Sequence, residues 1–267
     1  MRVASILAAT SLFLSAAHGF GLGFAADSGG GGGGSKKIVV SNNCKDTLRI
    51  GVSTNGQSGG GETFDLSPGS SQTITKSDHW GGRVWGAHCG DGGGSGGNNK
   101  SGGNNGTSNS GGNNKNSKRD DGGHCSGGAD NPASLAEFFF KGMGGHDYYD
   151  ISLVDGYNLP MTINPDKSGS GSGKYQCGSP SCDVPSCPKE YVVKDSSGKV
   201  TGCKSSCSAT NSDEHCCKGK YDDPKTCKPD QQSENIKKAC PDAYSFAYDD
   251  QTSTFNCAVD TYEVKFC

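Results

Sequence analysis

SLAEFFFKGMGGHDYYDISLVDGYNLP, residues 134–160, is the longest run of the sequence in which apolar, aromatic and acidic residues alternate. Residues that favour β-strands lie on both sides of a glycine cluster: Leu135, Phe138, Phe140, Tyr149, Ile151 and Leu153. Gly142, Gly144 and Gly145 are typical of a turn between two strands. The stretch therefore predicts a β-hairpin.

Four carboxylates lie within the predicted hairpin, at Glu137, Asp147, Asp150 and Asp155. The turn folds the second strand back on the first, so we expect Glu137 and Asp150 to lie near each other. A glycosidase uses such a pair, because one carboxyl group protonates the leaving oxygen and the other serves as nucleophile or base. Carboxylates are also common on the solvated face of an ordinary sheet, and the residues alone leave both interpretations open.

Short strands are also predicted in the rest of the chain. Residues 36–53 contain two β-rich runs around a polar turn, and further strands are expected at residues 63–66, 72–75, 83–85 and 262–266. Many short strands with closely spaced turn signals favour a β-sandwich or barrel. One short helix is expected at residues 233–238, with Ser233 as its N-cap and Ile236 facing inward.

The chain divides into segments of different composition. Residues 1–19 are typical of a secretory signal peptide, and the Gly-rich residues 20–35 are typical of a flexible linker. Residues 36–267 are expected to form one folded domain. The last part of this domain contains a cysteine-rich lobe at residues 177–240, followed by the final predicted strand of the sheet. The lobe needs disulfides because it is too polar to form a core of its own.

One segment inside the domain has a different character. Residues 90–124 consist mainly of Gly, Asn and Ser, so they bury too little apolar surface to offset their ordering entropy and are expected to be disordered. The insert contains N-glycosylation sequons at Asn99 and Asn105. It also contains the dibasic pair Lys118-Arg119, an accessible site for secretory-pathway proteases.

Three motifs resemble the thaumatin-like (pathogenesis-related 5) protein family. They are GGRVWGAHC at 81–89, SLAEF with YDISLVDGYNLPM inside residues 134–161, and CPDAYSFAYDDQTSTFNC at 240–257. The resemblance covers residues 36–267 apart from the insert. It implies a mainly β fold, a flattened two-sheet β-sandwich with a disulfide-rich lobe of loops and helices on one flank.

The chain contains 14 cysteines, an even number. Together with a signal peptide, this indicates a disulfide framework and not metal sites, although spacing alone leaves the connectivity open. The resemblance implies six pairs: Cys44–Cys267, Cys177–Cys257, Cys182–Cys240, Cys187–Cys203, Cys207–Cys216 and Cys217–Cys227. Cys89 and Cys125 remain, and we expect them to pair across the insert.

The thaumatin-like family has a cleft between sheet and lobe, lined by one Arg, one Glu and three Asp. The matching positions in this chain are Arg83, Glu137, Asp150, Asp155 and Asp249. Asp250 is the neighbour most easily confused with Asp249. Clustered carboxylates repel one another, so we expect at least one of them to have a raised pKa and to stay protonated.

The resemblance also suggests a role for each residue. Glu137 has apolar neighbours and is the candidate catalytic acid, whereas Asp150 is the candidate nucleophile or base. Arg83 is expected to orient one carboxylate through bidentate hydrogen bonds. Asp155 and Asp249 are expected to bind sugar hydroxyls or to hold Arg83.

Two further expectations concern geometry. Tyr149 and Tyr157 are candidates for stacking on sugar rings, with burial in the core as the alternative. Asp150 and Asp155 are five residues apart, so an ideal strand would place them on opposite faces. Both point into one cleft only if the strand ends, bends or bulges between them, and Gly156 is the expected end.

The resemblance implies a secreted, cell-wall-associated protein that binds β-1,3-glucan or another wall polysaccharide in antifungal defence or wall remodelling. Three functions stay open: an endo-β-1,3-glucanase, a non-catalytic lectin-like wall binder, and an inhibitor or effector of a secreted hydrolase. The formal net charge of −3 is too small to indicate nucleic-acid binding, and beyond the signal no apolar run is long enough to span a membrane. We expect a monomer without cofactor or metal.

Overall fold

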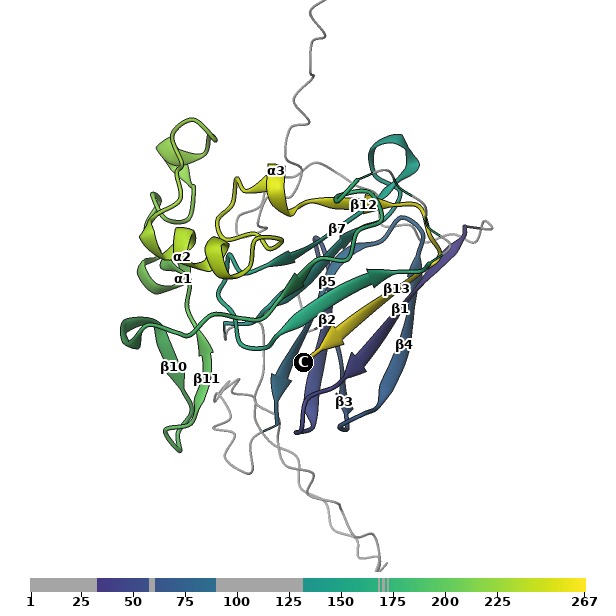
Figure 1. Cartoon of the computed structure of the whole chain (residues 1–267), viewed down its shortest axis with the longest axis horizontal. Helices are drawn as coiled ribbons and strands as arrows, with labels where there is room; N and C mark the ends of the chain where they lie inside the picture. Colours follow the sequence, from purple (N-terminus) through teal and green to yellow (C-terminus); the bar gives the residue numbers. More distant parts are fainter. Residues whose placement is uncertain (1–32, 58–60, 90–131, 168, 170, 172) are drawn as a thin grey trace, which may run out of the picture.

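The computed structural model describes residues 33–57, 61–89, 132–167, 169, 171 and 173–267 (Figure 1). Several sequence-based predictions lie outside these residues: the signal peptide at 1–19, most of the linker, the insert at 90–124 with Asn99 and Asn105, the pair Lys118-Arg119, and Cys125. Because they concern residues that the structure does not describe, they remain predictions.

The described strands form two main sheets, as the mainly β prediction requires (Figure 1). The first sheet has five strands in the order β4-β1-β13-β8-β9, which are Ser71–Ser77, Ser35–Asn42, Thr261–Phe266, Met161–Pro165 and Ser181–Cys182. β1 runs parallel to β13, and the other pairs are antiparallel. Ser35, the last residue of the predicted linker, pairs with Ser77 in this sheet.

The second sheet has six antiparallel strands in the order β12-β7-β6-β5-β2-β3. They are Phe255–Cys257, Asp147–Ser152, Leu135–Phe139, Gly81–His88, Leu48–Thr54 and Glu62–Leu66. β6 and β7 are the predicted hairpin, and their turn contains the 3₁₀ segment η1, Met143–Gly145. Gly144 and Gly145 have φ values of 70° and 77°, a region that favours glycine, so the glycine cluster explains the turn.

The main core lies between the two sheets and is rich in aromatic side chains. Phe138 and Tyr149 from the second sheet contact Tyr262 of β13, with ring centroids 5.5 and 5.2 Å from the Tyr262 ring. Asp147 also faces this core, where its Oδ2 accepts hydrogen bonds from Tyr262 Oη at 2.8 Å and pairs with Lys36 Nζ at 2.8 Å. The buried pair therefore joins β7 to the strands of the opposite sheet.

A lobe of short elements lies beside the sheets (green in Figure 1). It contains the strands β10 and β11, Val192–Lys194 and Val200–Cys203, the 3₁₀ segments η2 and η3, Lys189–Tyr191 and Gly219–Tyr221, and the helices α1 and α2, Ser206–Thr210 and Gln231–Ala239. The short helix α3, Asp250–Ser253, follows in the segment that returns to β12.

Six disulfides hold the described chain together, and they are the six pairs that the resemblance implies. Cys44–Cys267 joins residues 223 positions apart, whereas three pairs lie wholly within residues 187–227 of the lobe. Cys89 is also disulfide-bonded. Its predicted partner, Cys125, lies outside the described residues, and this pairing stays a prediction.

Helix α2 begins earlier than the sequence predicts. Its N-cap is Asp230, whose Oδ1 accepts a hydrogen bond from the Ser233 backbone N–H at 2.8 Å. The prediction of Ser233 as the cap is therefore wrong, because the aspartate three residues earlier takes that position. Ile236 is 1% exposed and faces inward as expected.

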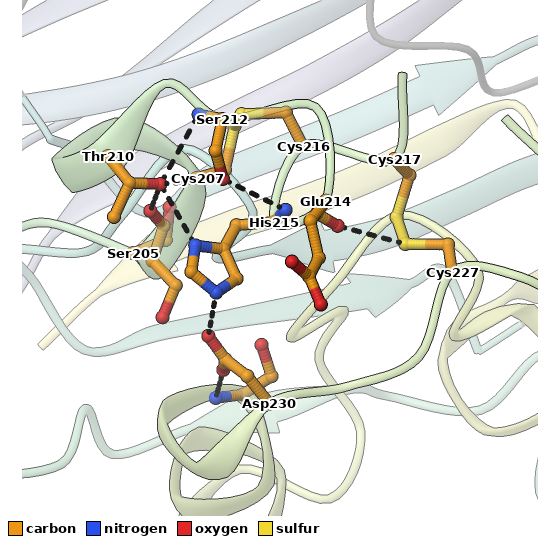
Figure 2. Close-up of polar contacts among 12 residues, drawn as sticks. Ser205, Cys207, Thr210, Ser212, Glu214, His215, Cys216, Cys217, Cys227 and Asp230 are labelled. Carbon is orange, nitrogen blue, oxygen red and sulfur yellow. Dashed lines mark hydrogen bonds and ion pairs between the residues drawn. A yellow bond between two sulfur atoms is a disulfide. The ribbon is translucent and has the colours of Figure 1, made fainter. Parts of the chain in front are cut away.

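Polar contacts replace apolar packing where α1 meets α2 (Figure 2). His215 Nδ1 lies 2.9 Å from Thr210 Oγ1 at the end of α1, and its Nε2 lies 3.5 Å from Asp230 Oδ2 at the start of α2. The disulfides Cys207–Cys216 and Cys217–Cys227 flank this histidine. The junction therefore depends on disulfides and hydrogen bonds, as expected for a small polar lobe.

Candidate functional site

A row of polar side chains crosses the six-stranded sheet on the face opposite the main core. The strand register pairs Arg83 of β5 with Glu137 of β6, and Glu137 with Asp150 of β7. Successive side chains of a strand point to opposite faces, and the flanking residues Val84, Ala136 and Ile151 are fully buried in the core. We call Arg83, Glu137 and Asp150 the acidic row, and its pairing confirms the expected proximity of Glu137 and Asp150.

Arg83 is held between a strand and a loop. Its Nε donates a hydrogen bond to Ser53 Oγ on β2 at 3.3 Å, and its Nη1 lies 3.5 Å from Asp155 Oδ2. Strand β7 ends at Ser152, before the expected end at Gly156. Since strand alternation no longer applies beyond Ser152, Asp155 reaches the side of the sheet that carries Arg83.

Glu137 lies at the centre of the row and is half-buried. Burial raises its pKa to about 7, the charge of Asp155 acts in the same direction, and Arg83 opposes both. A carboxyl group with this pKa is partly protonated at neutral pH and can donate or accept a hydrogen bond. This property fits the expected role of Glu137 as the acid of the site.

Asp150 has a different environment from the one that a nucleophile needs. It is 1% exposed, and neither carboxyl oxygen has a hydrogen-bond partner among the described residues. Burial, followed by the charges of Glu137 and Asp250, raises its pKa well above the usual range of an aspartate. A carboxyl group that is 1% exposed is poorly placed to contact a sugar carbon or a water molecule, so its burial argues against the role predicted for Asp150.

The segment after the lobe explains why Asp150 is buried. Tyr244 donates its backbone N–H to Ile151 O at 2.8 Å, and its carbonyl accepts from Leu153 N at 2.9 Å. This segment therefore pairs with the end of β7 and is held beside the acidic row. The strand pattern of residues 134–160 gives no indication of this cover, because it comes from residues about 90 positions later in the chain.

The structure distinguishes the two adjacent aspartates near α3. Asp249 Oδ2 lies 3.1 Å from Lys237 Nζ on α2 and accepts a hydrogen bond from the Ser245 backbone N–H at 3.1 Å. Asp249 therefore connects the segment that leads into α3 with helix α2. Asp250 Oδ1 accepts from Tyr244 Oη at 2.9 Å, and it is the charge of Asp250 that acts on Asp150. Of the two aspartates, Asp250 is therefore the one that acts on the acidic row through its charge, and the role expected for Asp249 in sugar binding stays a prediction.

Tyr149 and Tyr157 do not face a ligand site. Tyr149 is fully buried between the sheets, and its hydroxyl donates a hydrogen bond to Gly178 O at 2.6 Å. Tyr157 is 2% exposed. Both stacking candidates are therefore core residues, and for Tyr149 the sequence contains the reason, because it is adjacent to Asp150 in a strand and must point to the other face.

The same alternation identifies two aromatic residues that the sequence reasoning missed. Phe139 and Tyr148 pair across β6 and β7 in the next outward-facing position after Glu137 and Asp150. Phe139 is 41% exposed, and Tyr148 is half-buried. They therefore lie on the same face of the sheet as the acidic row.

In the part of the chain that the structure describes, no group of three or more His, Cys, Asp or Glu side chains is arranged to hold a metal ion. No helix among these residues is long and apolar enough to cross a membrane.

Comparisons with known proteins agree with the motifs. The model of the Thaumatin family matches residues 42–267. The chain is 42% identical over 232 residues to pathogenesis-related protein 5 of Arabidopsis thaliana, with 85% of this chain and 88% of the relative covered. It is 44% identical over 146 residues to a Prunus avium protein named glucan endo-1,3-beta-glucosidase, with 54% and 58% covered. The solved thaumatin-like xylanase inhibitor TLXI aligns over 86% of this chain and 98% of its own, at 16% identity and a TM-score of 0.37.

Proposed function

The chain belongs to the thaumatin family, and we propose that Arg83 and Glu137 of its acidic row bind β-1,3-glucan of cell walls outside the cell. The observation that carries the proposal is the side-by-side placement of Arg83 and a half-buried Glu137 whose pKa is about 7. Sugar hydroxyls both donate and accept hydrogen bonds. The guanidinium of Arg83 supplies donors, and Glu137 supplies a donor or an acceptor according to its protonation state.

Two observations support the class of ligand and the compartment. A relative that shares 44% identity over 146 residues has a name that refers to 1,3-β-glucan, and its matched region contains more than half of this chain. Six disulfides in the described chain are typical of proteins that fold in an oxidising secretory compartment. Wall polysaccharide is available to such a protein.

The binding test compares Glu137→Gln with wild type in titrations of soluble β-1,3-glucan at neutral and at mildly acidic pH. Gln keeps the size of the side chain but has no titratable proton, so we expect the variant to bind more weakly and to lose the pH dependence of binding. Glu62→Gln is the matched control, because Glu62 is an exposed carboxylate on the edge strand β3. Wild-type protein that binds no β-1,3-glucan contradicts the proposal.

Hydrolysis is a second candidate, and one observation favours it. A half-buried carboxyl group with a pKa of about 7 can donate a proton to a leaving oxygen near neutral pH. The burial of Asp150 counts against its role as the second carboxylate, whereas the side chain of Asp155 is 55% exposed and lies beside Arg83. A catalytic pair of Glu137 and Asp155 therefore fits the described geometry better than the pair Glu137 and Asp150.

Reducing-sugar release from soluble β-1,3-glucan separates these alternatives. An endo-glucanase that uses Glu137 and Asp155 loses activity in both Glu137→Gln and Asp155→Asn, while Asp150→Asn keeps most of it. Loss of activity in Asp150→Asn without any loss of thermal stability restores the original assignment. Glucan binding without sugar release in the wild type identifies a lectin-like wall binder.

A further inference from the structure

Phe139 and Tyr148 form a pair of rings on the outer face of the β6–β7 hairpin, and we call them the aromatic pair. The register places them directly opposite each other. Both rings pack over Gly142, where an added Cβ would lie 2.9 Å from a Tyr148 ring atom and 3.0 Å from a Phe139 ring atom. Tyr148 Oη also donates a hydrogen bond to Met143 O at 3.3 Å, which fixes the orientation of this ring.

The exposure of this surface is unusual for the chain. Among the described residues, the exposed large hydrophobic side chains are Phe139, Met143 and Val200, and the first two lie in this one hairpin. The other rings of the hairpin, Phe138, Phe140 and Tyr149, are at most 1% exposed. An apolar surface retained on the solvent side of a sheet is typical of a contact site.

The aromatic pair continues the acidic row along the same two strands. Phe139 follows Glu137 by two residues on β6, and Tyr148 precedes Asp150 by two residues on β7. Two residues of a strand span about 7 Å, so the rings begin within one side chain's reach of the row. A ligand that extends along the hairpin from the acidic row therefore passes directly over the aromatic pair.

We propose that the aromatic pair is a sugar-stacking subsite that holds the part of a β-1,3-glucan chain extending beyond the acidic row. This inference rests on the proposed function. A pyranose ring has apolar C–H faces and a polar rim, and the hairpin offers matching surfaces, with rings at its turn and hydrogen-bonding groups further along the sheet. The occupant is thus a second segment of the same polysaccharide that binds at Glu137.

The size of the surface favours this occupant over a second copy of the protein. A stable interface between two proteins buries on the order of 1,200–2,000 Å² in total. Two partly exposed rings and one methionine cover only a small part of such an area. A chain of sugar rings, in contrast, needs only a narrow strip of surface.

The test uses chain length as its readout. Affinities of soluble β-1,3-glucan oligosaccharides, from a disaccharide to a hexasaccharide, are measured by calorimetry for wild type, Phe139→Ala and Phe139→Tyr. We expect Phe139→Ala to weaken binding of the hexasaccharide by about tenfold and to leave the disaccharide unchanged. Phe139→Tyr keeps a ring and retains wild-type affinity. Val200→Ala is the matched control, because it removes an exposed apolar side chain in the lobe.

The outcomes distinguish failure of the subsite from failure of the proposed function. Wild-type protein that binds no oligosaccharide contradicts the proposed function itself. Wild-type binding that Phe139→Ala leaves unchanged at every chain length overturns the subsite alone. An equal loss of affinity for short and long oligosaccharides also overturns the subsite. The Phe139 ring then affects binding at the acidic row and does not contact the more distant sugar rings. A wild-type dimer that dissociates in Phe139→Ala assigns the rings to self-association and overturns the subsite.

Discussion

Asp147 and Asp150 are three residues apart on β7 and have opposite environments. Asp147 faces the main core, where Lys36, Tyr262 and the backbone N–H of Lys141 contact its two oxygens. Asp150 faces the other side and has no hydrogen-bond partner among the described residues. The first carboxylate is stabilised by its neighbours, whereas the second is stabilised by keeping its proton.

Asp150 makes stability depend on pH in a direction opposite to that of an ordinary carboxylate. Its pKa is raised in the folded protein, so its contribution to stability is fully present below the unfolded pKa of about 4 and is lost as pH rises through the folded value. Asp150→Asn is neutral at every pH. We therefore expect the variant to gain stability relative to wild type at neutral pH, by about 1–3 kcal/mol, and to gain little near pH 4.

Thermal and denaturant unfolding of wild type and Asp150→Asn at the two pH values measure this difference. Asp183→Asn is the control, because Asp183 is an exposed carboxylate in the lobe. A difference between Asp150→Asn and wild type that does not change with pH means that Asp150 is already ionised in the folded protein.

At the scale of elements, α2 shows how one polar residue supports both a helix start and the contact of that helix with its neighbour. Asp230 caps α2 through Ser233 N and also lies 3.5 Å from His215 Nε2. The Asp230 carboxylate thus caps α2 and also contacts His215 at the junction between α1 and α2. Disulfides on both sides of His215 keep the junction closed while these contacts orient α2.

Removal of the cap tests this arrangement. Asp230→Ala is expected to lower the free energy of unfolding by about 1–2 kcal/mol, because it leaves a helix N–H without its acceptor and removes the partner of His215. Glu234→Ala, at an exposed position in the first turn of α2, is expected to cost only a few tenths of a kcal/mol. Chemical denaturation of both variants provides the comparison. Equal losses would show that charge near the helix start matters, and not the cap.

The hairpin also shows which parts of the site the sequence predicts. Strand alternation and the glycine turn predict β6, β7 and the pairing of Glu137 with Asp150, because these are local properties. Alternation would also have placed Tyr149 in the core and the aromatic pair outside. The burial of Asp150 and the effect of the Asp250 charge on it depend on how a distant segment packs on β7, and no local pattern contains that information.

At the scale of the whole molecule, Cys44–Cys267 closes a loop of 223 positions around nearly all of the described domain. In the chain-entropy model, a loop of this length restricts the unfolded chain more than the short disulfides of the lobe do. We expect the double variant Cys44→Ser, Cys267→Ser to lose about 4–5 kcal/mol of stability. The equivalent removal of Cys207–Cys216, which spans nine positions, is expected to cost less.

Denaturant titrations of the two double variants under non-reducing conditions check this order. Intact-mass measurements confirm that the remaining cysteines stay paired. A larger loss from Cys207–Cys216 would show that native contacts in the lobe, and not the entropy of the unfolded chain, determine what these bridges contribute.

The position of β13 has a consequence for how the protein is made. This strand follows every other strand in the chain, yet it lies between β1 and β8 in the five-stranded sheet. Until β13 has been synthesised, β1 has β4 as its one neighbour among the described strands, and Cys44 lacks the partner with which it forms the longest described disulfide. An unpaired strand edge invites wrong strand pairing and a free thiol invites exchange, so the five-stranded sheet and its longest covalent link are completed together when β13 arrives.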